Sequence, residues 1–481
     1  MLFFRHKMLN LHTKSAAKVI LFLDICKFFC TFAANFNVFI MKNTLFLIAC
    51  VLVGALTCTH AQETTHQRFV GGDISMLPKY EQYNSPYLDP NGREISNLLT
   101  WFIEKCKWNT FRVRIFVNPG TSDPSVCQTT AYVAALGKRI KDAGAFFMLD
   151  FHYSDTWVDA THIQAPAAWQ GKSASVMADS ISAYTHRTLQ TLKAAGATPD
   201  LVQVGNEIMY GLCGIKVTPY SNSSTDANWP NYINLLKAGC NAVREECPQA
   251  QIIIHTDRPT NTSNNKYYYQ KLVDANLDFD VIGLSYYPFW HGYLTPEQNT
   301  VNLVTSINRL ATDFPTKRVQ IVECAYNFQY WPSSGVNYNT QSIWPCSVVG
   351  QYNFVRDLVD ALQPLENVDG ISYWFPEEAG SGDTGSVIPS WLNRGFWSED
   401  KSTSGHTINM TKSSAVGQKL QNICAPYYMA NFLTSPTQGI EETAETQNKN
   451  NSATKILKDG KLFILRGDQT YTPSGALINR K

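Results

Sequence analysis

Two glutamates carry the strongest chemical signal in this sequence. Glu207 follows Asn206 at the end of the apolar run Leu201–Asn206, and Glu323 ends a second run, Arg318–Glu323. Hydrolysis of a glycosidic bond needs such a pair, because one carboxylate attacks the anomeric carbon while the other protonates the leaving oxygen. A separation of about 5–5.5 Å would retain the anomeric configuration. The competing interpretation is that Glu323 only forms a salt bridge with an inward arginine.

The roles of the two carboxylates follow from their expected protonation states. Glu207 must be protonated to act as an acid, so we expect a raised pKa, caused chiefly by the negative charge of Glu323. An arginine beside Glu323 would keep that group ionised, as a nucleophile must be. After a glycosyl-enzyme forms, Glu207 would act as base on water. Asn206 is expected to donate to the sugar 2-hydroxyl or to the nucleophile. Tyr287 would hold Glu323 in line, and Trp374 would lie under the sugar ring.

These residues need a scaffold, and the hydrophobic pattern predicts one. Short apolar, β-rich runs recur eight times in the middle of the chain, and helix-like segments fill most of the gaps. Alternating strands and helices predict a parallel sheet, and eight units predict a (β/α)8 TIM barrel of the α/β class. The predicted strands are Phe69–Ile74, Thr110–Phe116, Ala145–Phe151, Leu201–Asn206, Gln251–Thr256, Asp280–Tyr286, Arg318–Glu323 and Asp369–Phe375.

The ends of the predicted strands place the glutamates together. In a barrel of this kind the active site forms at the C-terminal face, where all strands end. Every predicted strand carries polar or aromatic groups at this rim, which a purely structural core would not produce. Strands four and seven lie on opposite sides of the barrel, so Glu207 and Glu323 would face each other. Arg112 and Arg114 project the same way from strand two, and the sequence does not decide between them, although we favour Arg112.

The N-terminal segment predicts export. Residues 1–40 are interpreted as a misassigned leader, with Met41 as the true start and residues 41–61 as a signal peptide cut after Ala61. The apolar run 44–56 is too short to span a bilayer. A membrane anchor made from residues 18–56 is the alternative, and lipidation at Cys50 or Cys58 also stays open. The mature protein would be periplasmic, on the cell surface or extracellular.

The remaining domain organisation is simple. We expect the catalytic barrel over residues 62–430, a polar linker over 431–454 and a small C-terminal tail over 455–481. The tail alternates polar and apolar residues around turn signals, which predicts a β-hairpin-like unit. It is similar to short tails on some secreted bacterial proteins, and a frayed end without a role is the alternative.

Cysteine content and charge limit the partners. Of the 12 cysteines, eight follow the predicted leader, and export would permit disulfides. Cys240 with Cys247 and Cys106 with Cys127 are the plausible pairs. No cysteine or histidine cluster indicates zinc. The net charge of +1, without a basic block, argues against nucleic-acid binding, and we expect a monomer.

Several stretches resemble glycoside hydrolase family 53, the endo-β-1,4-galactanases. They read GGDISML (71–77), NTFRVRIFVNP (109–119), LDFHYSDTWVDATHIQAPAAW (149–169), LVQVGNEIMYG (201–211), DVIGLSYYPFWHG (280–292) and VQIVECAYNF (319–328). The resemblance implies cleavage of β-1,4-galactan in pectin side chains, with Glu207 as proton donor and Glu323 as nucleophile. It also implies that the galactose subsites are lined by Asp73, Arg112, His152, Asp155, Trp157, Asn206, His255, Tyr287, His291 and Trp374.

Departures from the family pattern limit what carries over. Cys324 stands where the family usually has threonine. Some relatives bind calcium through an acidic loop after strand seven, but the loop 329–340 contains no carboxylate here. Calcium prefers several anionic oxygens, so we expect no metal there and no cofactor, while Glu377 and Asp383 leave room for a different site. The rival functions are a retaining endo-glycanase acting on mannan, xylan or glucan, and a non-catalytic glycan-binding barrel.

Overall fold

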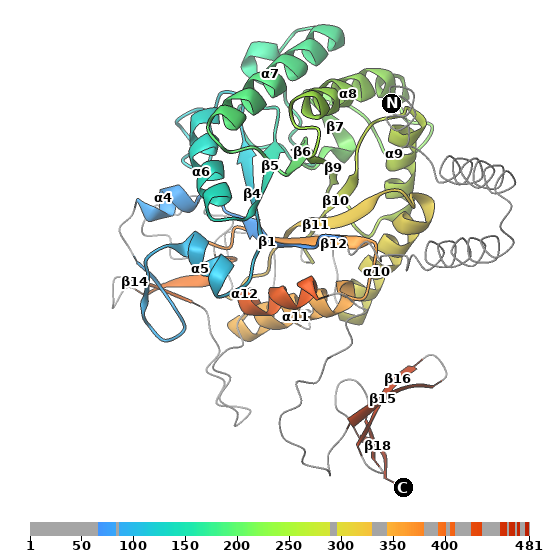
Figure 1. Ribbon diagram of the computed structural model, residues 1–481. Helices are drawn as coiled ribbons and strands as arrows, with labels where there is room; N and C mark the ends of the chain where they lie inside the picture. Colours follow the sequence, from blue (N-terminus) through green and yellow to red (C-terminus); the bar gives the residue numbers. More distant parts are fainter. Residues whose placement is uncertain are drawn as a thin grey trace, which may run out of the picture. The chain divides into compact units, whose positions relative to one another are not determined.

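The computed structural model describes residues 66–82, 86–288, 296–329, 344–379, 393–400, 405–408 and 425–434, and four strands of the tail (Figure 1). Eight parallel strands form a closed barrel in which β12 pairs with β1. They are β1 (Phe69–Asp73), β4 (Thr110–Ile115), β5 (Phe146–Phe151), β6 (Leu201–Val204), β9 (Gln251–Thr256), β10 (Val281–Tyr286), β11 (Arg318–Cys324) and β12 (Val368–Trp374). The predicted (β/α)8 barrel is therefore confirmed, and every strand lies where the sequence placed it.

Helices surround the strands (Figure 1). They are α4 (Leu77–Glu81), α5 (Leu98–Glu104), α6 (Thr130–Asp142), α7 (Ala174–Ala194), α8 (Trp229–Glu246), α9 (Thr262–Asp274), α10 (Pro296–Asp313), α11 (Val348–Leu362) and α12 (Ala425–Tyr428). Local sequence sets their ends. The side chain of Thr129 caps α6 by accepting from the Tyr132 amide, and Ser173 caps α7 in the same way. Gly144 and Gly196 follow these two helices with positive φ, which favours termination.

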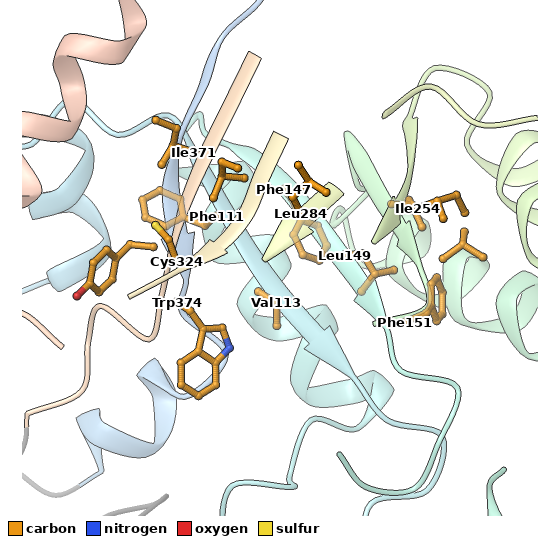
Figure 2. Close-up of a cluster of buried hydrophobic side chains, with 14 of the residues drawn as sticks. Phe111, Val113, Phe147, Leu149, Phe151, Ile254, Leu284, Cys324, Ile371 and Trp374 are labelled. Carbon is orange, nitrogen blue, oxygen red and sulfur yellow. The ribbon is translucent and has the colours of Figure 1, made fainter. Parts of the chain in front are cut away.

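Side-chain alternation sorts the strands into two layers. Outward residues such as Phe111, Val113, Phe147 and Leu149 pack in the core between strands and helices (Figure 2). Inward residues fill the barrel with one apolar layer, formed by Phe69, Met148, Leu201, Ile253, Val281 and Val322. Further along the strands the inward positions become polar. The period of two therefore separates a packed wall from a chemically active interior.

A β-bulge interrupts this alternation in β11. Leu284 pairs with Ile321, but the next residue of β10, Ser285, pairs with Glu323. Val322 is thus the extra residue, and both Val322 and Glu323 turn into the barrel. Cys324 then rejoins the outer core shown in Figure 2. Bulges are known to re-aim side chains next to active sites, and here the bulge directs Glu323 inward.

Short sheets and the tail complete the described part. β2 (Tyr87–Leu88), β3 (Glu94–Ile95), β13 (Trp397–Asp400) and β14 (Gly405–Ile408) form one sheet, and β7 (Gly211–Leu212) pairs with β8 (Ile215–Lys216). In the tail, β15 (Ala453–Lys458), β16 (Lys461–Arg466), β17 (Gln469–Tyr471) and β18 (Leu477–Arg480) form an antiparallel sheet, which is larger than the expected hairpin.

The N-terminal predictions are not tested by the structure. Residues 1–65, with the predicted leader and signal peptide, lie outside the described residues, so the domain boundaries stay predictions. Among the residues that are described, no helix combines the length and apolar character needed to cross a membrane.

The expected disulfides do not form. All seven cysteines in the described part of the chain are free, including Cys106, Cys127, Cys240 and Cys247. Cys240 lies inside α8 and Cys247 directly follows it, so seven residues of helical rise separate them by about 10 Å. Bridged cysteines need Cα atoms within about 7 Å.

Gly71 offers a test of the barrel closure. A Cβ at this position would lie 1.6 Å from the Thr110 carbonyl oxygen on the adjacent strand. We expect Gly71→Ala to lower the free energy of unfolding by about 3 kcal/mol, because backbone must move to relieve the overlap. Gly120→Ala, whose nearest neighbour would lie 4.0 Å away, should change it by less than about 0.5 kcal/mol. Urea unfolding followed by fluorescence measures both, and equal effects would contradict the packing argument.

Candidate active site

The polar layer inside the barrel is organised around Arg112, which is 1% exposed. Its Nη1 donates to Asp73 Oδ2 at 2.7 Å. Its Nη2 lies 2.8 Å from Asp150 Oδ2, 2.8 Å from Glu323 Oε1 and 2.9 Å from Asn206 Oδ1. A buried charge is tolerated only when it is paired and hydrogen-bonded. The three carboxylates and the Asn206 amide oxygen together supply these partners for the Arg112 guanidinium.

The structure decides between the two predicted arginines. Arg114 contacts Asp73 Oδ1 at 3.4 Å, donates to the Ser125 carbonyl oxygen at 3.1 Å and lies 4.3 Å from the ring centroid of Trp157. Arg112, and not Arg114, forms the ion pair with Glu323. The preference for Arg112 as the site arginine agrees with this geometry.

Glu323 is held at both oxygens. Arg112 binds Oε1, and the Tyr287 hydroxyl donates to Oε2 at 2.8 Å, as expected for Tyr287. Burial raises the pKa of Glu323, to about 7, while Arg112 and Tyr287 act in the opposite direction. Of the two glutamates, Glu323 has the contacts that favour a carboxylate.

Glu207 has a different environment. It follows β6 with φ of +48°, and its side chain is only partly exposed. Removal from water raises the pKa of Glu207 well above its ordinary value, and the charges of Glu323 and Asp257 raise it further. The expected direction is correct, but burial, and not Glu323, is the largest cause.

One serine links the two glutamates. Ser285 pairs with Glu323 across β10 and β11, and its hydroxyl donates to Glu207 Oε1 at 2.6 Å. Since paired strands lie about 4.8 Å apart, the carboxyl groups share one end of the barrel. The sequence therefore placed these two residues correctly with respect to each other.

The predicted histidines belong to a buried network. The Nδ1 of His152 accepts from the Val158 amide at 3.1 Å, and its Nε2 lies 3.2 Å from Asp150 Oδ2. Burial lowers the pKa of His152 and lowers that of His255 still more. His255 contacts Ser285 through Nε2 at 2.8 Å. Both histidines are less than 2% exposed, so they support the carboxylates from within the barrel.

Other predicted residues have separate positions. Trp157 and Trp374 lie beside each other with ring centroids 6.3 Å apart. Asp155 accepts from the backbone amides of Asn118 and Ala167, so it fastens two loops. His291 lies outside the described residues.

Three members of the network were not selected from the sequence. Asp150, Gln203 and Ser285 are buried and connect Arg112, His255 and Glu207. Their signal was a polar residue at an inward position of a mostly apolar strand. A polar residue in a strand can be assigned to such a network only when its side chain is known to point into the barrel.

The described residues do not form a metal site. Within the described ranges, no group of three or more His, Cys, Asp and Glu side chains is arranged to hold a metal ion. Glu377 accepts from the Met76 amide, whereas Asp383 and nearly all of the loop 329–340 lie outside those ranges.

A (β/α)8 barrel that carries two glutamates at the C-terminal end of its strands has the arrangement expected of a glycoside hydrolase. The chain belongs to glycosyl hydrolase family 53, whose model matches residues 69–423.

Individual relatives agree with this assignment. An uncharacterized protein of Niallia circulans is 31% identical over 74% of this chain and 92% of its own length. A probable arabinogalactan endo-β-1,4-galactanase A of Aspergillus terreus is 32% identical over 66% of this chain and 87% of its own length. Among solved structures, a fungal β-1,4-galactanase has a TM-score of 0.56 and 26% identity, covering 71% of this chain and 96% of the other.

Replacing Arg112 tests the charge balance. Arg112→Met keeps a long side chain but removes the cation between Asp150 and Glu323. We expect a loss of about 3–5 kcal/mol in the free energy of unfolding near pH 7, because buried carboxylates lose their partner. Lys138→Met, which breaks an exposed pair with Asp142, should cost less than about 1 kcal/mol.

The stability lost in Arg112→Met should depend on pH. Burial raises the pKa of Asp150, but Arg112 and His152 outweigh it and hold the pKa below its ordinary value. A depressed carboxyl pKa stabilises the fold above about pH 4 and is lost as pH falls through the folded-state pKa. Without Arg112 the burial of Asp150 raises its pKa, so the variant binds a proton as pH falls from about 7 and its deficit should be largest near pH 7 and shrink toward about pH 4. Urea unfolding at both pH values measures it, and a deficit that grows with acid would contradict the charge argument.

Proposed function

We propose that this glycoside hydrolase cuts internal β-1,4 linkages of galactan, in the side chains of pectin, with retention of configuration and after export. The contrast between the two glutamates carries the mechanism. Glu323 is bound by a cation and a phenol, whereas Glu207 Oε1 receives one serine hydroxyl. Two carboxyl groups in unlike environments are the pattern expected of an acid and a nucleophile.

In the first step Glu323 attacks the anomeric carbon. The bond from that carbon to the leaving oxygen breaks, and the proton on Glu207 passes to this oxygen. Arg112 and Tyr287 hold Glu323 in place through its two oxygens. The products are a covalent glycosyl-enzyme, a deprotonated Glu207 and a released chain end.

In the second step Glu207 accepts a proton from water. The water oxygen attacks the same anomeric carbon, and the bond to Glu323 breaks. Both steps invert the carbon, so the product keeps the starting configuration. The negative charge moves from Glu323 to Glu207 and back, so before the first step it lies on Glu323, the glutamate that Arg112 contacts.

Galactan as the substrate is supported by the names of relatives and by two neighbouring tryptophans. Relatives from Aspergillus terreus and Cellvibrio japonicus carry the name arabinogalactan endo-β-1,4-galactanase. Trp157, in the segment after β5, lies beside Trp374, the last residue of β12, and aromatic rings stack on the apolar side of a pyranose. Export is supported by the sequence of residues 41–61.

Removal of the acid tests the mechanism. Glu207→Ala should lower kcat on galactan by roughly 10²–10⁴-fold, because the leaving oxygen is no longer protonated. With an activated aryl β-galactobioside, added azide should restore turnover and give the β-galactobiosyl azide, identified by NMR. Glu245→Gln, an exposed carboxylate on α8, should leave kcat unchanged. An α-galactobiosyl azide, or full activity of Glu207→Ala, would contradict the assignment.

A panel of glycans tests the substrate. Purified protein should release reducing ends from potato galactan and act far more slowly on mannan, xylan and cellulose. Viscosity of the galactan solution should fall well before much sugar is released, since internal cuts shorten chains fastest. Turnover of another glycan with none on galactan would refute the proposed specificity.

A further inference from the structure

Two buried residues, Ser285 and His255, contact Glu207 and have no part in the two proposed steps. The Ser285 hydroxyl lies 2.6 Å from Glu207 Oε1, and His255 Nε2 lies 2.8 Å from Ser285 Oγ. The other ring nitrogen, His255 Nδ1, lies 3.3 Å from the backbone nitrogen of Glu207. His255 thus contacts the same residue twice, once at its backbone and once through Ser285.

The donors and acceptors around His255 fix the direction of these bonds. The Glu207 amide can only donate, so His255 Nδ1 accepts. The Nε2 of Gln203, 2.9 Å from Nδ1, also donates, because Gln203 Nε2 bonds to the carboxylate of Asp150 at 2.6 Å. His255 is buried, and burial lowers its pKa well below the ordinary value, so the ring is neutral.

A neutral ring whose Nδ1 accepts carries its proton on Nε2. That proton points at Ser285 Oγ, so the serine hydroxyl must direct its own proton to Glu207 Oε1. Asn206 Oδ1 lies 3.2 Å from His255 Nδ1, but it already accepts from Arg112 at 2.9 Å. The chain of bonds therefore runs from His255 to Ser285 to Glu207.

We propose that Ser285, oriented by His255, is a positioning residue that keeps Oε1 of Glu207 an acceptor and confines the acid proton to Oε2. Among the described residues Oε2 has no protein partner and is not a buried unpaired atom. It is the oxygen available to a leaving group. This inference rests on the proposed role of Glu207 as acid and base.

The same hydroxyl also limits how far the pKa of Glu207 rises. Burial, then Glu323 from β11, Asp257 after β9 and Asp159 after β5 all raise this pKa, and Ser285 is the group that lowers it. Tyr287 also lies near the pair. Loss of the Ser285 hydroxyl should raise the pKa of Glu207. The alkaline limb of kcat/KM, which needs protonated Glu207, would then move to higher pH.

Leaving-group dependence separates positioning from folding. Ser285→Ala should lower kcat/KM for galactan by roughly ten- to a hundredfold, as expected for a lost hydrogen bond to an ionisable group. For a dinitrophenyl β-galactobioside, whose leaving group needs no proton, kcat/KM should change by less than about threefold. Ser306→Ala, a buried serine of α10, should leave both values unchanged.

The outcomes are distinct. Equal losses on both substrates, or an unmoved alkaline limb, would overturn the role of Ser285. Wild-type protein that does not cleave galactan would instead overturn the proposed function. If Ser285→Ala does not fold, ¹⁵N NMR of His255 in the wild-type protein decides, because a proton on Nδ1 would reverse the chain of bonds and refute the proposal.

Discussion

The ion pair network of Arg112 is the constraint on which the site depends. One guanidinium on β4 reaches Asp73 on β1, Asp150 on β5 and Glu323 on β11. Each of these carboxylates would be costly to bury alone, and the shared cation offsets that cost at three strands at once. The network thus joins distant parts of the barrel wall at the level where the chemistry takes place.

That constraint also explains why the two glutamates differ. The cation is already committed to the side of the barrel that holds Glu323, so Glu207 meets neutral donors and other carboxylates. An acid needs the second environment and a nucleophile needs the first. The proposed division of roles would therefore follow from where one positive charge lies, since the two side chains are identical.

The sequence predicts the barrel well, because strands covered on both faces are apolar runs and strand ends share one rim. Glu207 and Glu323 could be found for the same reason. Asp155 was placed in a galactose subsite by the resemblance alone, since a carboxylate that fastens backbone amides looks the same in sequence as one that meets a sugar. The pair Cys240–Cys247 failed because spacing along the chain ignores helical rise. Ser285 was missed because its partner His255 lies on a different strand, and only their register brings them together.

The bulge in β11 limits which changes of sequence keep Glu323 inside the barrel. Loops at the rim can gain or lose residues, since their ends stay where the strands leave them. The segment Ile321–Cys324 is limited in another way, because its backbone conformation, and not only its sequence, decides where Glu323 points. If the same residues formed a regular strand, strict alternation would turn Glu323 toward the helices and send Cys324 into the barrel. Substitutions that favour a regular strand there would therefore remove Glu323 from the site while leaving every glutamate in the sequence.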